Sequence, residues 1–123
     1  MYLYAISNYD IADALVAGDK PTLLDFVIHK DYLNVEPLAI VALALAKVKN
    51  ILLATQNSGK TAAELGMSDK QFGFLKRNYS KFPQERLHTL IRFLSNIDYK
   101  LKNGLLDMPK SLQLDYIISN MLG

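Results

Sequence analysis

The sequence has no cysteine, and none of its apolar runs is long enough to cross a membrane. The absence of cysteine excludes disulfides and thiolate metal sites, and it fits a reducing compartment. The longest apolar run, Leu38–Ala46, has nine residues, whereas a transmembrane helix needs about 20. The N-terminal residues have neither a basic region nor a long apolar region, so no secretory signal is predicted. We therefore expect a cytoplasmic protein that does not contact a membrane.

Charge of one sign and histidine are also scarce. The 123 residues include 14 basic and 12 acidic side chains, a net charge of +2. That charge is too small to indicate nucleic-acid binding by itself. His29 and His88 lie far apart in the sequence and lack the spacing of metal ligands. We expect no metal site, no cofactor and no small-molecule substrate.

Half of the residues are hydrophobic, and they recur with the period of a helix. Nearly every segment places apolar residues at steps of three or four, and no segment alternates with period two. The pattern predicts helices over about 8–17, 20–29, 36–55, 61–65, 69–79, 84–102 and 109–122. We expect one domain, residues 1–123, that is an all-α single helical bundle of about six to seven helices.

The same pattern predicts which side chains form the core. The helix over 36–55 is apolar nearly all round at its start, so we place it at the centre. The other expected buried faces are Ile11, Ala14 and Leu15; Leu24, Val27 and Ile28; Leu87, Leu90, Ile91, Leu94, Ile97 and Leu101; and Leu114, Ile117, Ile118, Met121 and Leu122. Asp19 and Ser68 are placed to cap the helices that follow them, and Gly104 to end the helix over 84–102.

Residues Ala54–Thr61 nearly match a phosphate-binding P-loop, with alanine in place of the first glycine. A true P-loop follows a buried strand of a parallel sheet. Here residues 41–53 have the period of a helix, and no βαβ pattern exists elsewhere. We interpret the match as a helix–loop–helix connection with Gly59 in the loop. The competing hypothesis is a nucleotide site that depends on Lys60.

Residues Thr61–Asn78 have the spacing of a helix-turn-helix, with Gly66 in the turn. A DNA-binding version would place the second helix in the major groove. Its candidate DNA contacts are Lys70, Gln71, Lys76, Arg77 and Lys81. The competing interpretation is an ordinary corner between two packed helices. Phe74 favours packing, because a groove-reading face seldom carries a bare phenylalanine.

Catalytic patterns are weak throughout the sequence. No serine lies beside a histidine in a signature context, so no nucleophile–base pair stands out. Asp98 is the carboxylate that we expect to be partly buried, since it adjoins the apolar stripe at Ile97. One interpretation is an acid–base group. The other, which we favour, is an ion pair or a helix-end hydrogen bond that fixes helix packing. We expect no catalytic residue and no enzyme activity.

The order of short motifs resembles one known family. It starts with Gly18-Asp19, Asn34-x-x-Pro37 and the stretch Ala63–Ser68, and ends with a leucine-rich helix followed by Asp98, Leu101, Lys102, Gly104 and Asp107. In this order the chain resembles the C-terminal collar domain of the bacterial DNA polymerase III delta subunit, a part of the clamp loader. The resemblance covers about residues 8–122.

The resemblance implies a helical collar element that packs beside other clamp-loader subunits of the tau/gamma and delta-prime types. It implies assembly during DNA replication, with a secondary role in holding primer-template DNA, and no nucleotide hydrolysis. It also implies that the chain is either a piece of a longer parent or a short relative. The interface candidates flank the turn before Asp107 and the last helix: Phe93, Tyr99, Leu105, Leu106, Tyr116 and Met121.

Overall fold

A computed structural model describes residues 8–29, 36–56 and 60–122, and every regular element within these ranges is a helix. The elements are α1 (Asn8–Ala17), α2 (Lys20–Ile28), α3 (Pro37–Gln56), a 3-10 helix η3 (Ala63–Leu65), α4 (Asp69–Tyr79), α5 (Gln84–Lys102) and α6 (Lys110–Leu122). The predicted all-α bundle is confirmed, and the helix bounds agree with the prediction within two residues. Asn34 and Gly59, which the sequence analysis singled out, lie outside the described ranges.

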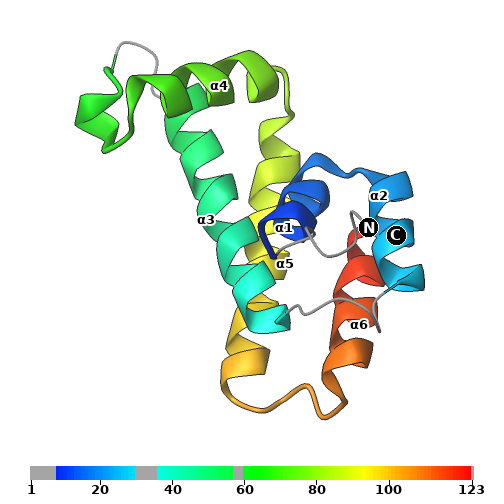
Figure 1. The fold of residues 1–123 in the computed structure, drawn as a ribbon. Coiled ribbons are helices and arrows are strands. Elements are labelled where there is room, and N and C mark those ends of the chain that lie inside the picture. The colour runs from blue at the N-terminus through cyan, green and yellow to red at the C-terminus, as the bar shows by residue number, and fades with distance from the viewer. Residues whose placement is uncertain (1–7, 30–35, 57–59, 123) are drawn as a thin grey trace.

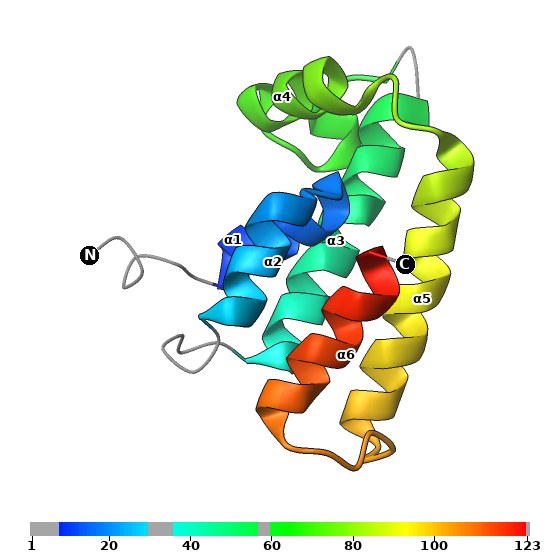
Figure 2. The same cartoon turned by 90° about the vertical axis from the view of Figure 1, so that its right-hand side faces the viewer.

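Helix α3 is the central element, as its apolar sequence predicted. It contacts α1, α4, α5 and α6 (Figures 1 and 2). Ile40, Val41 and Ala44 are buried near its start, and Val48 and Ile51 further along. By length and composition alone α3 could cross a membrane, but a core helix of a bundle has the same two properties.

The core side chains of α1, α5 and α6 follow the predicted stripes. Leu87, Leu90, Leu94 and Ile97 are buried on α5, while Ile91 and Leu101 are partly buried at the edge of the same stripe. Leu114, Ile117 and Ile118 are buried on α6. Full burial of one such side chain contributes about 1.5–3 kcal/mol, so these stripes hold the long helices against α3.

The predicted buried face of α2 is wrong for Leu24 and Ile28, whereas Val27 packs partly buried against the core. Leu23 and Phe26 are buried, whereas Leu24 is 52% exposed and Ile28 is 73% exposed. Five of the six residues from Leu23 to Ile28 are apolar, so two adjacent faces of this short helix look equally suited to burial. Packing of α2 against α1 and α6 selects the face that carries Leu23 and Phe26.

The segment before α4 also differs from the prediction. The expected short helix over 61–65 is a single 3-10 turn, Ala63–Leu65. Its start is closed by a reciprocal pair of bonds: the Thr61 backbone N–H donates to Glu64 Oε1 at 2.9 Å, and the Glu64 N–H donates to Thr61 Oγ1 at 3.3 Å. This is a capping box, and it satisfies the turn locally without a longer helix.

Three glycines end helical segments in the left-handed conformation: Gly18 (φ 73°), Gly66 (φ 75°) and Gly104 (φ 66°). After α1, the Asp19 N–H donates to Ala14 O and the Gly18 N–H to Leu15 O, the bond pattern of a Schellman motif. Asp19 then caps α2 by accepting from the Thr22 N–H at 3.3 Å, as predicted. Ser68 caps α4 in the same way, through the Gln71 N–H.

Candidate interaction surfaces

The turn between α5 and α6, which the sequence analysis singled out, is held by several hydrogen bonds. Gly104 reverses the chain, and the Leu105 N–H donates to Lys100 O at 2.8 Å. The amide of Gln113, on α6, donates to the Leu106 and Met108 carbonyls at 3.2 Å each. These bonds hold the turn from both sides, and Gln113 is a residue that sequence reasoning missed.

Asp98 lies on α5 just before this turn and is partly buried, as predicted. Its Oδ2 is 3.0 Å from Lys102 Nζ, and its side chain is 20% exposed. The pair joins residues one turn apart on the same helix, near the C-terminal end, where a cation suits the helix dipole. Asp98 therefore forms an ion pair at the end of the helix, which is the structural interpretation that the sequence favoured.

Three large apolar side chains are exposed at this end of the molecule. They are Tyr99 (61% exposed), Leu105 (57%) and Leu112 (49%), which lie in the last turns of α5, in the connecting turn and in the first turn of α6. We call them the hairpin end. The connecting turn lies at one end of the bundle in both views (Figures 1 and 2). Leu112 was not among the predicted interface residues.

The other predicted interface residues lie in different surroundings. Phe93, Leu106, Tyr116 and Met121 are partly buried against the core. Phe93 and Tyr99 are six residues apart on one helix, so they project about 120° apart around its axis. The structure thus groups Tyr99 with Leu105 at the hairpin end and directs Phe93 elsewhere.

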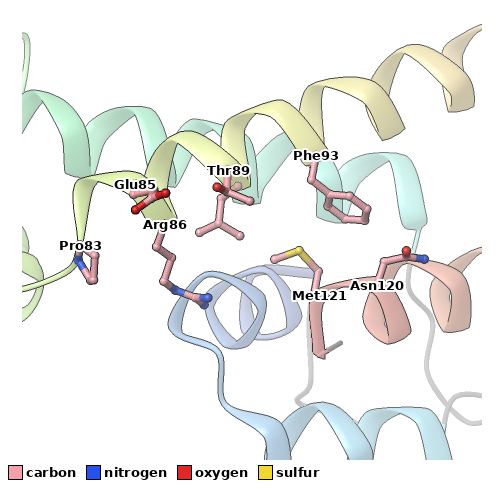
Figure 3. A pocket seen from close by; sticks show the side chains of 8 residues that line it. Pro83, Glu85, Arg86, Thr89, Phe93, Asn120 and Met121 are labelled. Carbon is pink, nitrogen blue, oxygen red and sulfur yellow. The ribbon is translucent and has the colours of Figure 1, made fainter.

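Phe93 and Met121 point into a hollow of about 530 Å³ between α5 and the end of α6 (Figure 3). Arg86, at the other side of the hollow, reaches α1, where its Nη2 donates to Val16 O at 3.2 Å. The Arg86 guanidinium also lies 5.3 Å from the Phe82 ring centre. Arg86 is thus engaged in joining α5 to α1, and the remaining wall of the hollow is mixed: Pro83, Leu90, Phe93 and Met121 are apolar, and Glu85, Thr89 and Asn120 are polar.

The predicted DNA-contact residues lie on α4 and just after it. Lys70, Gln71, Arg77 and Lys81 are exposed. Lys76 is also exposed, and its Nζ lies 5.0 Å from the Phe72 ring centre. Phe72 packs against the core, as the packing interpretation expects, but Phe74 is 47% exposed. Packing within the described chain therefore accounts for Phe72 and leaves Phe74 at the surface.

Lys47 is a cation held between three helices. Its Nζ lies 2.9 Å from Asp13 Oδ1 on α1 and 5.4 Å from the Tyr79 ring centre on α4. Burial alone would lower the pKa of Lys47, but the hydrogen bonds and charges of Asp13 and Tyr79 outweigh it and raise that pKa above its ordinary value. This group joins α1, α3 and α4, and we assign it to the fold.

Glu64 and His29 each have a hydrogen-bond partner a few residues away in the sequence. The hydrogen bonds from the Thr61 backbone and hydroxyl lower the pKa of Glu64, which is a capping effect. The His29 ring donates from Nδ1 to the Asp25 backbone carbonyl at 2.9 Å, and His88 is exposed on α5. Within residues 8–29, 36–56 and 60–122, no three His, Asp or Glu side chains come close enough to hold a metal ion.

The P-loop resemblance does not extend to the fold around it. Ile51–Ala54, the residues that would form the preceding strand, belong to α3. Lys60 is exposed and lies outside any helix. A P-loop depends on a strand-to-helix turn that presents backbone N–H groups to phosphates, so this context favours the helix–loop–helix interpretation of Ala54–Thr61.

Comparison with known proteins yields no match: no family model, no curated protein and no solved structure is significantly similar to this chain.

Proposed function

We propose that this domain is a non-catalytic assembly module of the clamp-loader collar type, which acts in DNA replication by packing against neighbouring subunits. The support is twofold: the fold is an all-α bundle, and the last group of residues that carry the resemblance, Asp98 to Asp107, lies at the turn between α5 and α6. In that hairpin Asp98 pairs with Lys102, and Gly104 takes the left-handed conformation that ends the helix. The proposed partners are subunits of the tau/gamma and delta-prime types.

The observation that carries the proposal is the hairpin end. Leu105 exposes a large apolar side chain on a turn that Gln113 holds by hydrogen bonds, and Tyr99 and Leu112 do so on the helices on either side of it. The buried centres of protein interfaces are more apolar than the rest of the surface, and tyrosine is enriched there. A surface that is ordered before binding also loses little conformational entropy on association. We infer that the hairpin end contacts a neighbouring subunit.

The proposal is tested by assembly of the purified chain with tau/gamma-type and delta-prime-type subunits, followed by size-exclusion chromatography with light scattering. The wild-type chain should co-elute with them. The double variant Tyr99→Asp/Leu105→Asp should weaken association by about tenfold or more, because interface anchors of this kind contribute about 2 kcal/mol or more.

The matched control is Ile28→Asp, which places the same charge on an exposed apolar residue of α2, outside the hairpin end. It should co-elute like the wild-type chain. A wild-type chain that stays monomeric in the presence of both partner types would refute the proposal, as would equal losses in the control and in the double variant.

A further inference from the structure

The outer face of α4 and the residues after it form a basic stripe around one exposed aromatic ring. Its members follow at steps of one, three or four along the helix: Lys70, Gln71, Phe74, Arg77, Asn78 and Lys81. From residue 69 to 81 the chain has four basic side chains and one acidic side chain, Asp69. We call this surface the α4 face.

The bundle does not cover the α4 face within the described residues. Helix α4 packs on α3 through the opposite side, where Leu75 and Tyr79 are buried. In the same ranges no ion pair joins Lys70, Arg77 or Lys81 to a carboxylate. The nearby acid Asp13 is already paired with Lys47 at 2.9 Å. The positive charge of the α4 face is therefore directed to solvent.

Phe74 stands between two hollows of about 310 Å³ each. One is lined by Ser68, Lys70 and Arg77, and the other by Tyr9 of α1 together with residues of α3. Phe74 and Gln71 line both of them. The Phe74 ring is 47% exposed and Tyr9 is 66% exposed, so the ring of Phe74 is open to a flat group from either hollow.

Gly73 lets Arg77 lie close to the helix beside this ring. A Cβ atom at position 73 would be 3.3 Å from Arg77 Nη1, so a larger residue would press on the guanidinium. Arg77 and Lys70 line the same hollow as Phe74. An exposed aromatic ring beside two hollows, with flanking cations, offers what single-stranded nucleic acids require: a stacking surface for bases and positive charge for phosphates.

We propose that the α4 face binds single-stranded nucleic acid without sequence selectivity, with a base stacked on Phe74 and the backbone near Lys70, Arg77 and Lys81. This activity goes beyond assembly through the hairpin end. It also differs from duplex recognition by a helix-turn-helix. That motif needs a first helix to cross the DNA backbone, and here a single 3-10 turn, Ala63–Leu65, stands in its place.

The test is fluorescence anisotropy of a labelled 20-nucleotide oligothymidylate with the whole purified chain. Each phosphate contact with single strands contributes a slope of about −0.7 in log affinity against log salt, so three contacts predict about −2. Arg77→Gln should reduce the magnitude of this slope by about 0.7. Lys20→Gln, an exposed lysine on α2, should leave it unchanged.

The aromatic contribution is tested separately from the charge. Phe74→Ala should weaken binding by about tenfold without changing the salt slope, because stacking is lost while the cations remain. Phe74→Trp should keep or improve the affinity. Tyr99→Ala removes a comparably exposed ring at the hairpin end and should have no effect.

Three results would overturn the proposal. The first is a 20-base-pair duplex, or a fluorescent polyglutamate peptide, that binds as tightly as the oligothymidylate at equal salt. The second is full affinity in a Phe74→Ala variant whose circular dichroism matches that of the wild-type chain. The third is the absence of any binding at about 50 mM salt, where the phosphate contribution is strong. None of these results depends on whether the chain assembles with other subunits.

Discussion

Gly18, Gly66 and Gly104 share a positive φ, yet only Gly18 is also crowded by a side chain. A Cβ atom at position 18 would lie 2.8 Å from Arg86 Nη2, whereas one at position 66 or 104 would meet nothing within 4 Å. Arg86 at that place donates to Val16 O. The chain therefore offers a matched comparison between backbone strain alone and backbone strain with a steric clash.

We predict that Gly104→Ala lowers the free energy of unfolding by about 1–2 kcal/mol, the cost of the left-handed conformation for a non-glycine residue. Gly18→Ala should cost about 1 kcal/mol more, since Arg86 must give up its hydrogen bond to Val16 O. Urea unfolding measures both. In an Arg86→Ala background the extra cost at position 18 should vanish, and equal costs in the wild-type background would contradict the assigned clash.

For single residues, the sequence predicts interactions between near neighbours in the chain well and contacts between residues far apart in the chain poorly. The caps at Asp19 and Ser68 and the glycine at position 104 were predictable, because a helix end depends on residues within a few positions. The contact of Arg86 with Val16 joins residues 70 positions apart. Nothing near Gly18 in the sequence indicates that contact.

Helix α2 shows the same limit for a whole element. Its predicted face, Leu24, Val27 and Ile28, obeys helical spacing as well as the observed one does. Periodicity identifies the helix but cannot choose between two neighbouring apolar faces. The choice depends on α1 and α6, which cover Leu23 and Phe26. The long helices α3 and α5 were predicted correctly because each carries several turns of a consistent pattern.

We predict that Leu23→Ala lowers the free energy of unfolding by about 2–5 kcal/mol, the usual cost of a cavity at a buried leucine. Leu24→Ala should change it by less than about 0.5 kcal/mol, because the side chain is half exposed. The two residues are adjacent in one helix and chemically identical, so each serves as the control of the other in urea unfolding. A larger loss at Leu24 would mean that α2 buries the face predicted from sequence.

The candidate surfaces could be predicted only in part, because the packing of the helices decides which side chains stay exposed. The sequence indicated the α5–α6 hairpin and the basic residues of α4. It left Leu112 off the buried stripe of the last helix, yet it did not name this residue among the interface candidates. It also assigned Phe74 to packing, although exposure of that ring depends on how α4 crosses α3.

The described helices differ in how many neighbouring helices they pack against. Helix α3 is buried by contacts with α1, α4, α5 and α6, whereas among the described helices α4 packs mainly on α3. Helix α4 lies at the end of the bundle opposite the α5–α6 turn (Figures 1 and 2). Regions with few buried apolar contacts open at lower free energy than the core. The two proposed surfaces thus lie at opposite ends, the hairpin end near the turn and the α4 face on the less supported helix.

We therefore predict that native-state hydrogen exchange is less protected in α4 than in α3 and α5. Leu75→Ala should lower protection in α4 further and leave the strongest-protected amides of α5 nearly unchanged, because Leu75 is one of only two buried side chains of α4 in the described structure. Addition of oligothymidylate should raise protection in α4 if it binds there. Exchange of α4 amides at the same free energy as α3 would contradict the prediction, since it would mean that α4 opens only with the whole bundle.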